Sequence, residues 1–386
     1  MNESKTNLNV KVILSLTLIH FIGDIYCSFI NPLLPVFVDK FSLTLAQVGL
    51  LAGISRFLAF IVQPSVGYLA DRYQTRFFIL GGPLLSIVFI PLGGIAPAFW
   101  MLLLFVSLGS IGSSMFHPPT AGMVSTYAGR HFGFSMSLFN LGGTMAFGVG
   151  PLLITFIVGS YGLKAAPFSM ILGLAVMIYL FLTVPSPQGE GLAEFGIVGS
   201  LKEVFGSVWK PIALMWLVMV LRSYAGQSFM TFLPIMFSEE GYSLVSIGLI
   251  VSTFTVAGAI SGLLAGHFSD KIGYKPIFYF SFILTTPSLF LLLFLPRSWV
   301  YAGVFLTGFL IMATMPLGVA WAQQLAPRGK SMVSSLMMGL AFGTGGMMAP
   351  VTGKLADIYS IRSVLLFIAV LPLLAISLVH LIPEKR

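Results

Sequence analysis

Long apolar stretches separated by short polar segments make up most of this chain of 386 residues. An apolar stretch of roughly 20 residues can cross the ~30 Å hydrocarbon core of a bilayer as an α-helix. Such stretches are found at 12–38, 45–69, 77–96, 98–125, 131–158, 164–184, 210–237, 244–266, 276–295, 298–324, 331–354 and 362–382. The pattern predicts an all-α membrane protein with twelve transmembrane helices, six in each half.

Two matching loops relate the halves to each other. In each loop an Asp stands four residues after a Gly and a basic residue nine after it, counting from Gly67 in the first half and Gly266 in the second. The same shift of 199 residues relates three further pairs, which are Pro35 and Pro234, Gly49 and Gly248, and Pro151 and Pro350. A constant shift indicates a duplicated unit, and duplicated helical membrane units are typical of transporters.

The duplication predicts the domain organisation. We expect two pseudo-symmetric six-helix bundles, at 1–184 and 210–386, joined by a cytoplasmic linker at 185–209. This linker is the longest polar interval of the chain.

The composition agrees with a protein whose solvent is lipid. Hydrophobic residues make up 57% of the chain and charged residues 8%, with a mean hydropathy of +0.98. So few polar groups cannot cover a water-soluble globule of this size. Cys27 is the only cysteine, which excludes an intrachain disulfide and a cysteine-based metal cluster. We expect no metal and no cofactor.

The distribution of basic residues predicts the orientation. If the N-terminus is cytoplasmic, thirteen Lys and Arg residues fall in inner segments and five in outer segments. This asymmetry satisfies the positive-inside rule and places both termini in the cytoplasm. The net charge of +8 is scattered over short loops, so the expected partner is the lipid bilayer and not nucleic acid.

Polar residues of the first span lie on one stripe of its helix. His20, Asp24, Ser28 and Asn31 follow one another at spacings of four, four and three. Ionisable residues at bilayer depth usually face a cavity or a partner. Asp24 is therefore a candidate for taking up and releasing a proton, with His20 one turn away to tune it. The alternative is a structural hydrogen-bonded pair that ties this span to a neighbour.

The fourth span has a similar polar face. Ser110, Ser113, His117 and Thr120 share it, and the pair Pro118-Pro119 follows His117 directly. Prolines remove backbone donors, so carbonyls that they free need a cavity or a hydroxyl group. His117 is a candidate for lining a cavity, although a packing histidine explains it equally well.

Two arginines inside spans suggest an anionic substrate. Arg56 lies near the middle of the second span and Arg222 within the seventh. Two fixed positive charges against one titratable acid favour an anion in the interior. The alternatives are an ion pair between Arg56 and Asp24 and a snorkelling Arg222. The candidate substrate-binding residues are Asn31, Arg56, His117, Arg222, Tyr224, Gln227 and Gln323.

The duplicated loops suggest a latch at the cytoplasmic side. A carboxylate at the inner end of a span can pair with basic residues and helix N-termini of neighbouring helices. Anchoring of topology explains the basic residues but not the duplicated acids. The candidate gating residues are Asp71, Arg72, Arg76, Asp270, Lys271 and Lys275.

These residues also carry a family resemblance. The loop at Gly67, which reads Gly-Tyr-Leu-Ala-Asp-Arg, resembles the loop 2–3 signature of the major facilitator superfamily. Over nearly its whole length the chain resembles the fosmidomycin-resistance group of drug exporters. The motifs concerned are His20-x-x-x-Asp24, Phe41-Ser-Leu-Thr, Gln63-Pro64-x-x-Gly67-Tyr, Gly112-Ser-Ser-x-Phe116-His117-Pro118, Gly129-Arg130-His131, Gly142-Gly143 with Gly150-Pro151, and Ala341-Phe342-Gly343-x-Gly345-Gly346.

The resemblance implies a central cavity lined by the first, fourth, seventh and tenth of the predicted spans, and transport by alternating access. It also implies proton-driven export with Asp24 as the coupling acid. The chain departs from the group where acids are usual, because Pro119 follows His-Pro and Gln324 follows Ala-Gln. Arg56 is an addition, and Gly150-Pro151 is only part of the antiporter signature.

Together these features predict a secondary transporter of the inner or plasma membrane. We expect a monomer that exports a small anionic or amphiphilic organic compound in exchange for protons. The alternatives are a proton symporter for uptake of an organic acid or sugar, and a membrane sensor without transport. The chain has no His-Glu-x-x-His, no Gly-x-Ser-x-Gly and no complete phosphate-binding loop of the form Gly-x-x-x-x-Gly-Lys-Ser/Thr, so an enzyme is not expected.

Overall fold

A computed structural model describes residues 8–73, 76–129, 132–186, 206, 208–326, 333 and 335–383. Most of the linker predicted at 185–209 lies outside these residues. All the regular elements of the described residues are helices, with no strand among them, as predicted for an all-α membrane protein. They divide into two compact units, which are described separately.

Unit 1 comprises Met1–Phe41, Leu58–Leu192 and Tyr242–Ser252. Its helices are α1 (Val10–Cys27), α2 (Ile30–Phe41), α4 (Gly82–Leu92), α5 (Phe99–Tyr127), α6 (Phe132–Tyr161) and α7 (Met170–Thr183), with the end of α3 (Leu45–Tyr73) and the start of α10 (Leu244–Ile272). Phe77–Gly81 forms a π-helical turn before α4, and Gly93–Ile95 and Leu163–Ser169 are 3₁₀-helical.

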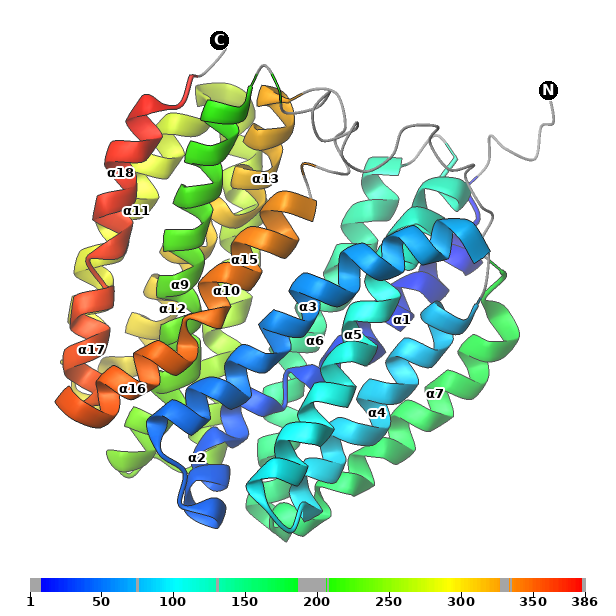
Figure 1. The fold of residues 1–386 in the computed structure, drawn as a ribbon, viewed down its shortest axis with the longest axis horizontal. Helices are drawn as coiled ribbons and strands as arrows, with labels where there is room; N and C mark the ends of the chain where they lie inside the picture. The colour runs from blue at the N-terminus through cyan, green and yellow to red at the C-terminus, as the bar shows by residue number, and fades with distance from the viewer. Residues whose placement is uncertain are drawn as a thin grey trace. The chain divides into compact units, whose positions relative to one another are not determined.

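Helix α1 lies at the centre of unit 1. It packs against α4, α5, α6 and α7, and Figure 1 shows it among these helices. A helix that is apolar all round is stable when neighbours surround it, and this environment holds the few polar side chains of α1 away from lipid. His20 and Asp24 are both buried.

Unit 2 comprises Ser42–Phe57, Ala193–Gly241 and Thr253–Arg386. Its helices are α9 (Trp209–Glu239), α11 (Tyr274–Leu292), α12 (Val300–Met312), α13 (Thr314–Leu325), α15 (Phe342–Met347), α16 (Ala349–Tyr359), α17 (Ile361–Ile368) and α18 (Leu371–Leu381), with the start of α3 and most of α10. Arg297–Trp299 is 3₁₀-helical and Ser335–Ala341 is π-helical.

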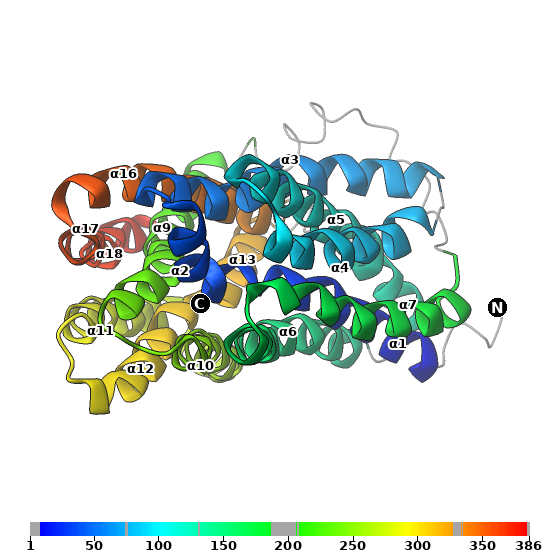
Figure 2. The ribbon, with the colours of Figure 1, turned by 90° about the horizontal axis from the view of Figure 1, so that it is seen from below.

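The core of unit 2 is built around aromatic side chains. Trp321 on α13 is fully buried, stacks on Tyr274 and contacts the edge of Phe278. These rings connect α13 to α11, while α9 and α18 supply the surrounding aliphatic residues. In Figure 2 these helices are seen close to end-on, with α9 beside α18 and α11 beside α12.

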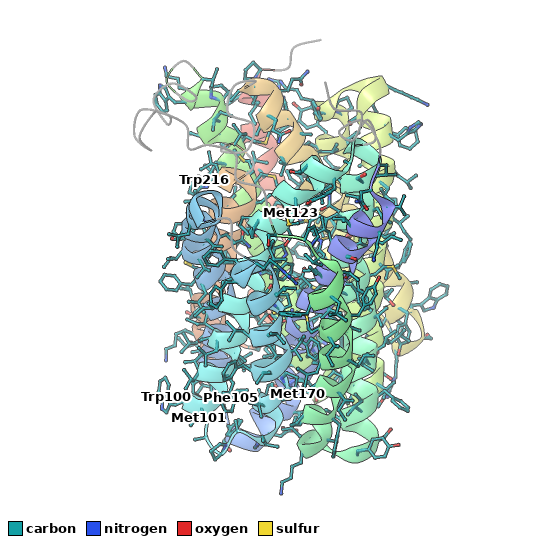
Figure 3. The ribbon with its side chains drawn as sticks, turned by 90° about the vertical axis from the view of Figure 1, so that its right-hand side faces the viewer. Trp100, Met101, Phe105, Met123, Met170 and Trp216 are labelled. Atoms are coloured by element: carbon teal, nitrogen blue, oxygen red, sulfur yellow. The ribbon has the colours of Figure 1, made fainter. Side chains whose placement is uncertain are left out.

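Large apolar side chains cover the outside of both units, as a bilayer requires. Trp100 and Leu182 in unit 1 are 69% and 79% exposed, and Phe367 in unit 2 is 82% exposed. In Figure 3, Trp100, Met101 and Phe105 lie towards one end of α5, and Met123 lies further along it. An aqueous solvent would not tolerate this surface.

Eleven helices of the described residues are long and apolar enough to cross a membrane. The predicted span at 331–354 is not among them; it lies partly outside the described residues, and its described part comprises the π-helix, α15 and the start of α16. The predicted count of twelve is thus approximately matched.

The glycine and proline pairs that repeat in the sequence form equivalent helix contacts in the two units. A Cβ atom at Gly49 on α3 would lie 2.2 Å from the carbonyl oxygen of Ala349, beside Pro350. A Cβ atom at Gly248 on α10 would lie 2.2 Å from Thr155 and 2.9 Å from the carbonyl oxygen of Pro151. In each unit a glycine therefore allows one helix to approach a second helix at its proline.

Candidate functional site

Three ionisable side chains of unit 1 meet inside the bundle. The Oδ2 atom of Asp24 lies 3.3 Å from Nε2 of His20, one turn earlier on α1, and 3.3 Å from Nε2 of His117 on α5. The hydroxyl of Ser113 donates to Oδ1 of Asp24 at 3.1 Å. The structure thus joins the polar stripe of the first span to that of the fourth. We call His20, Asp24 and His117 the His–Asp–His cluster.

The ring of His20 is fixed by α6. Its Nδ1 atom lies 2.8 Å from the carbonyl oxygen of Phe139, and the ring stacks on the Phe139 side chain at 4.2 Å between centroids. A Cβ atom at Gly143 would lie 2.4 Å from Nε2 of His20, so only glycine leaves room for the ring there. The predicted Gly142-Gly143 motif is therefore part of the site's construction.

The ring of His117 is fixed by its own helix. Its Nδ1 atom lies 2.6 Å from the carbonyl oxygen of Ser113, and its ring stacks on Phe116 at 4.2 Å. Helix α5 continues through Pro118 and Pro119. The hydroxyl of Thr120, on the same polar face, donates to the carbonyl of Phe116.

These contacts determine which nitrogens carry hydrogen. A carbonyl oxygen can only accept, so both Nδ1 atoms must donate. In a neutral imidazole Nε2 then has a free lone pair, and in both histidines this atom faces the Asp24 carboxylate. With Asp24 ionised and both histidines neutral, three acceptors would converge without a hydrogen between them. The cluster therefore needs positive charge, supplied by one or two protons or by a cation.

The members of the cluster differ in access. The side chains of His20 and Asp24 are 10% and 7% exposed, whereas that of His117 is 28% exposed. His117 is thus the most exposed member of the cluster. One nitrogen of each histidine and one oxygen of Asp24 all lie within 4.8 Å of one another, and these atoms could also ligate a metal ion.

Arg222 is a buried charge in unit 2. Its side chain is 3% exposed, donates from Nε to the carbonyl of Ile311 at 3.0 Å, and lies over the ring of Phe342. No carboxylate in the described part of the chain forms an ion pair with it. A guanidinium buried without a counter-ion can bind an anion, and its burial disagrees with a snorkelling side chain.

The other candidate substrate residues have varied surroundings. Arg56 donates to Gln227 at 3.5 Å, and both residues belong to unit 2. The hydroxyl of Tyr224 accepts from Thr352 at 3.1 Å. Asn31 and Gln323 are half-buried on α2 and α13. An ion pair between Arg56 and Asp24 would join the two units, and it stays a prediction.

The candidate gating residues are described only in part. Arg76 donates to the carbonyl of Phe181 and lies over its ring. Lys275 donates to the carbonyl of His380 at 3.0 Å, and Lys271 is exposed at the end of α10. The side chains of Asp71, Arg72 and Asp270 lie outside the described residues. The latch is therefore still a prediction.

Two components of the site were not predicted. The carbonyl of Phe139 fixes His20, and no sequence signal identifies a backbone acceptor on a distant helix. Ser113 was assigned to the polar face of the fourth span, but its bond to Asp24 depends on the packing of α5 against α1.

Comparisons with known proteins give a consistent result. A sequence model described as Major Facilitator Superfamily matches residues 16–330 and 215–386. The Fosmidomycin resistance protein of Escherichia coli (strain K12) is 27% identical, over 100% of this chain and 96% of its own length. Multidrug resistance protein MdtG of Enterobacter lignolyticus is 26% identical, over 78% of this chain and 73% of its own length.

Solved structures share the fold. A bacterial homolog of the human lysosomal transporter Spinster, inward-facing and unoccupied, superimposes with a TM-score of 0.80 at 16% identity, covering 97% of this chain and 98% of its own. The nucleoside transporter NupG gives a TM-score of 0.74 at 13% identity, with 97% and 100% covered.

Proposed function

The chain belongs to the Major Facilitator Superfamily, and from this premise we propose that it exports a small anionic or amphiphilic organic compound in exchange for protons. As a member of this family it is a multi-pass membrane transporter and not an enzyme. The proton coupling, the direction of transport and the substrate class are our proposals.

The convergence of His20, Asp24 and His117 is the observation that carries the proposal. Three proton acceptors converge inside unit 1, and protons can supply the positive charge that this arrangement needs. A buried cluster that gains and loses positive charge can couple proton movement to a change of conformation. In our proposal protons load the cluster from the outside and leave it to the cytoplasm, with Asp24 as the coupling acid and His20 and His117 as its partners.

The energy available from this exchange is sufficient for export. One proton that moves inward gains about 2.3 kcal/mol per 100 mV of membrane potential. Since about 1.4 kcal/mol corresponds to a factor of ten, this electrical term alone supports a gradient of tens-fold.

Arg222 supports an anionic substrate. Its guanidinium is buried in unit 2 without a carboxylate partner among the described residues, and a negatively charged group would supply the missing charge. Arg56, Tyr224, Gln227, Asn31 and Gln323 are proposed to provide further polar contacts. The names of two relatives refer to fosmidomycin resistance and multidrug resistance, which supports export as the direction.

The remaining parts of the proposal follow from the sequence. We place the protein in the inner or plasma membrane as a monomer. Both termini are proposed to lie in the cytoplasm, because basic residues concentrate in the inner segments. The latch of Asp71, Arg72, Arg76, Asp270, Lys271 and Lys275 would hold the cytoplasmic side closed and release it during the cycle.

Export can be tested in a bacterial strain that lacks its own drug exporters. Cells that produce this chain are expected to tolerate more fosmidomycin, or another anionic antibiotic of a screening panel, and to accumulate less of the compound. Counterflow of the labelled compound in proteoliposomes is the second measurement. Greater accumulation would favour the symporter, and a compound that binds but shows no counterflow would favour the sensor. Either outcome would reject the exporter.

A further inference from the structure

We propose that His20, Asp24 and His117 form a binding site for a divalent transition-metal ion, with Zn²⁺ as the best fit. The metal binding itself follows from the geometry of the cluster. Its effect on transport rests on the proposed function, because the same three side chains would carry the protons.

The spacing of the ligand atoms fits a tetrahedral metal ion. Oδ2 of Asp24 lies 3.3 Å from each Nε2 atom, and the three atoms lie within 4.8 Å of one another. Metal–ligand bonds of about 2.0–2.1 Å place neighbouring ligands of a tetrahedral Zn²⁺ about 3.3–3.4 Å apart. A charge-assisted hydrogen bond would bring the same atoms to about 2.7–2.9 Å. The two distances from Asp24 to the histidines therefore match the ligand spacing around a shared ion better than the length of direct bonds.

The surroundings of the cluster orient its ligands. Metal-binding histidines usually donate their second ring nitrogen to a carbonyl or carboxylate, which points the other nitrogen at the ion. His20 does so to Phe139 at 2.8 Å, and His117 does so to Ser113 at 2.6 Å. The Ser113 hydroxyl holds Oδ1 of Asp24 at 3.1 Å and leaves Oδ2 to face both histidines. Oδ2 of Asp24 and the two Nε2 atoms thus face one another, with their other polar atoms already bonded elsewhere.

The ligand types select the metal. Two imidazoles and one carboxylate suit Zn²⁺, Co²⁺ or Ni²⁺ better than Mg²⁺ or Ca²⁺, which prefer oxygen, or Cu⁺, which prefers sulfur. With three protein ligands a fourth position remains for water or for a substrate group. At 28% exposure, the His117 side chain is the most accessible of the three ligands.

A bound metal ion would act on the coupling site. Zn²⁺ beside an ionised Asp24 gives a net charge of +1, the same as the state in which both histidines are protonated. The ion would therefore imitate this doubly protonated state of the cluster and prevent proton exchange. Under the proposed function, micromolar zinc is a reversible inhibitor of transport by this chain.

The binding can be measured without any transport substrate. The full-length protein is purified in detergent without a polyhistidine tag, stripped with a chelator, and titrated with Zn²⁺ by calorimetry and with Co²⁺ by visible absorption. We expect one saturable site per chain and an intense Co²⁺ spectrum of low coordination number. His117→Ala and Asp24→Asn should each weaken binding by more than the roughly 10–100-fold that loss of a supporting residue costs.

Matched controls separate this site from adventitious binding. His267 and His380 are exposed histidines outside the cluster, so His267→Ala and His380→Ala should leave the titration unchanged. His117→Cys should retain binding and add a thiolate-to-cobalt charge-transfer band, which identifies position 117 as a ligand even if His117→Ala fails to fold.

Two results would overturn the metal site. One is a wild-type Co²⁺ spectrum equal to that of the hydrated ion, and the other is binding that persists in folded His117→Ala and Asp24→Asn proteins. Zinc binding in a protein that shows no proton-coupled transport would reject the proposed function and leave the metal site intact.

Discussion

Replacing Gly143 by alanine tests how closely α6 holds the His–Asp–His cluster. A methyl group at this position would lie 2.4 Å from Nε2, 2.7 Å from Cε1 and 2.9 Å from Cδ2 of His20. An ordinary contact begins at 3.4 Å, so the ring must retreat by roughly 1 Å. The bond from Nδ1 to Phe139 and the stacking on its ring oppose this movement.

The expected cost follows from this overlap. Overpacking of a well-packed interior costs about 1–3 kcal/mol, while glycine to alanine in a helix gains about 0.5–1 kcal/mol by itself. Gly122→Ala on α5 is the matched control, because no atom lies within 4 Å of the added Cβ there. We expect Gly143→Ala to be less stable than Gly122→Ala by about 1–3 kcal/mol and to lose most proton-coupled transport.

Thermal unfolding in detergent measures the first effect and transport in proteoliposomes the second. His20→Ala in the Gly143→Ala background should recover stability, since it removes the ring that the methyl group displaces, and the double-mutant cycle should give a coupling of about 0.5–3 kcal/mol. If Gly143→Ala matches Gly122→Ala in both stability and transport, α6 does not position His20 and the reasoning fails.

Three further substitutions give distinct expected outcomes. Arg222→Met should leave the free energy of unfolding unchanged or raise it by about 1–4 kcal/mol, since a buried charge is removed. The same substitution should reduce export of an anion, and unchanged anion transport would contradict the assignment. Asp357 accepts from the backbone N–H groups of Leu45 and Ala46 at 2.7 and 3.0 Å, so Asp357→Ala should lower the unfolding free energy by about 0.5–2 kcal/mol, and Asp357→Asn by less. Breaking the pair of Arg362 with Glu240, whose side chains are 45% and 35% exposed, should cost no more than about 1 kcal/mol in the same unfolding measurement, and a larger loss would show that the pair is not a simple surface contact.

Much of the fold could be predicted from periodicity and repetition. Apolar length alone identifies the spans because the bilayer fixes the length of a crossing helix. The constant shift between the halves anticipated that Gly49 and Gly248 have equivalent roles, and each indeed allows a close helix contact. The predicted span at 331–354 is described only in part, as the π-helix Ser335–Ala341, α15 and the start of α16.

The site was predictable within helices but not between them. The spacing of four residues places His20 and Asp24 on one face, and the structure pairs them. His117 was assigned to a polar face of its own span, but its meeting with Asp24 depends on the packing of α5 against α1. Sequence periodicity describes one helix at a time and cannot supply this pairing.

The most direct test of the central claim is proton movement through the His–Asp–His cluster. Inside-out vesicles that contain the wild-type chain are energised to acidify their interior, and a pH-sensitive dye reports the gradient when the compound identified in the export screen is added outside. The account predicts that the wild-type chain dissipates the gradient as the compound enters, and that folded Asp24→Asn does not. Equal dissipation by Asp24→Asn would contradict the assignment of Asp24 as the coupling acid.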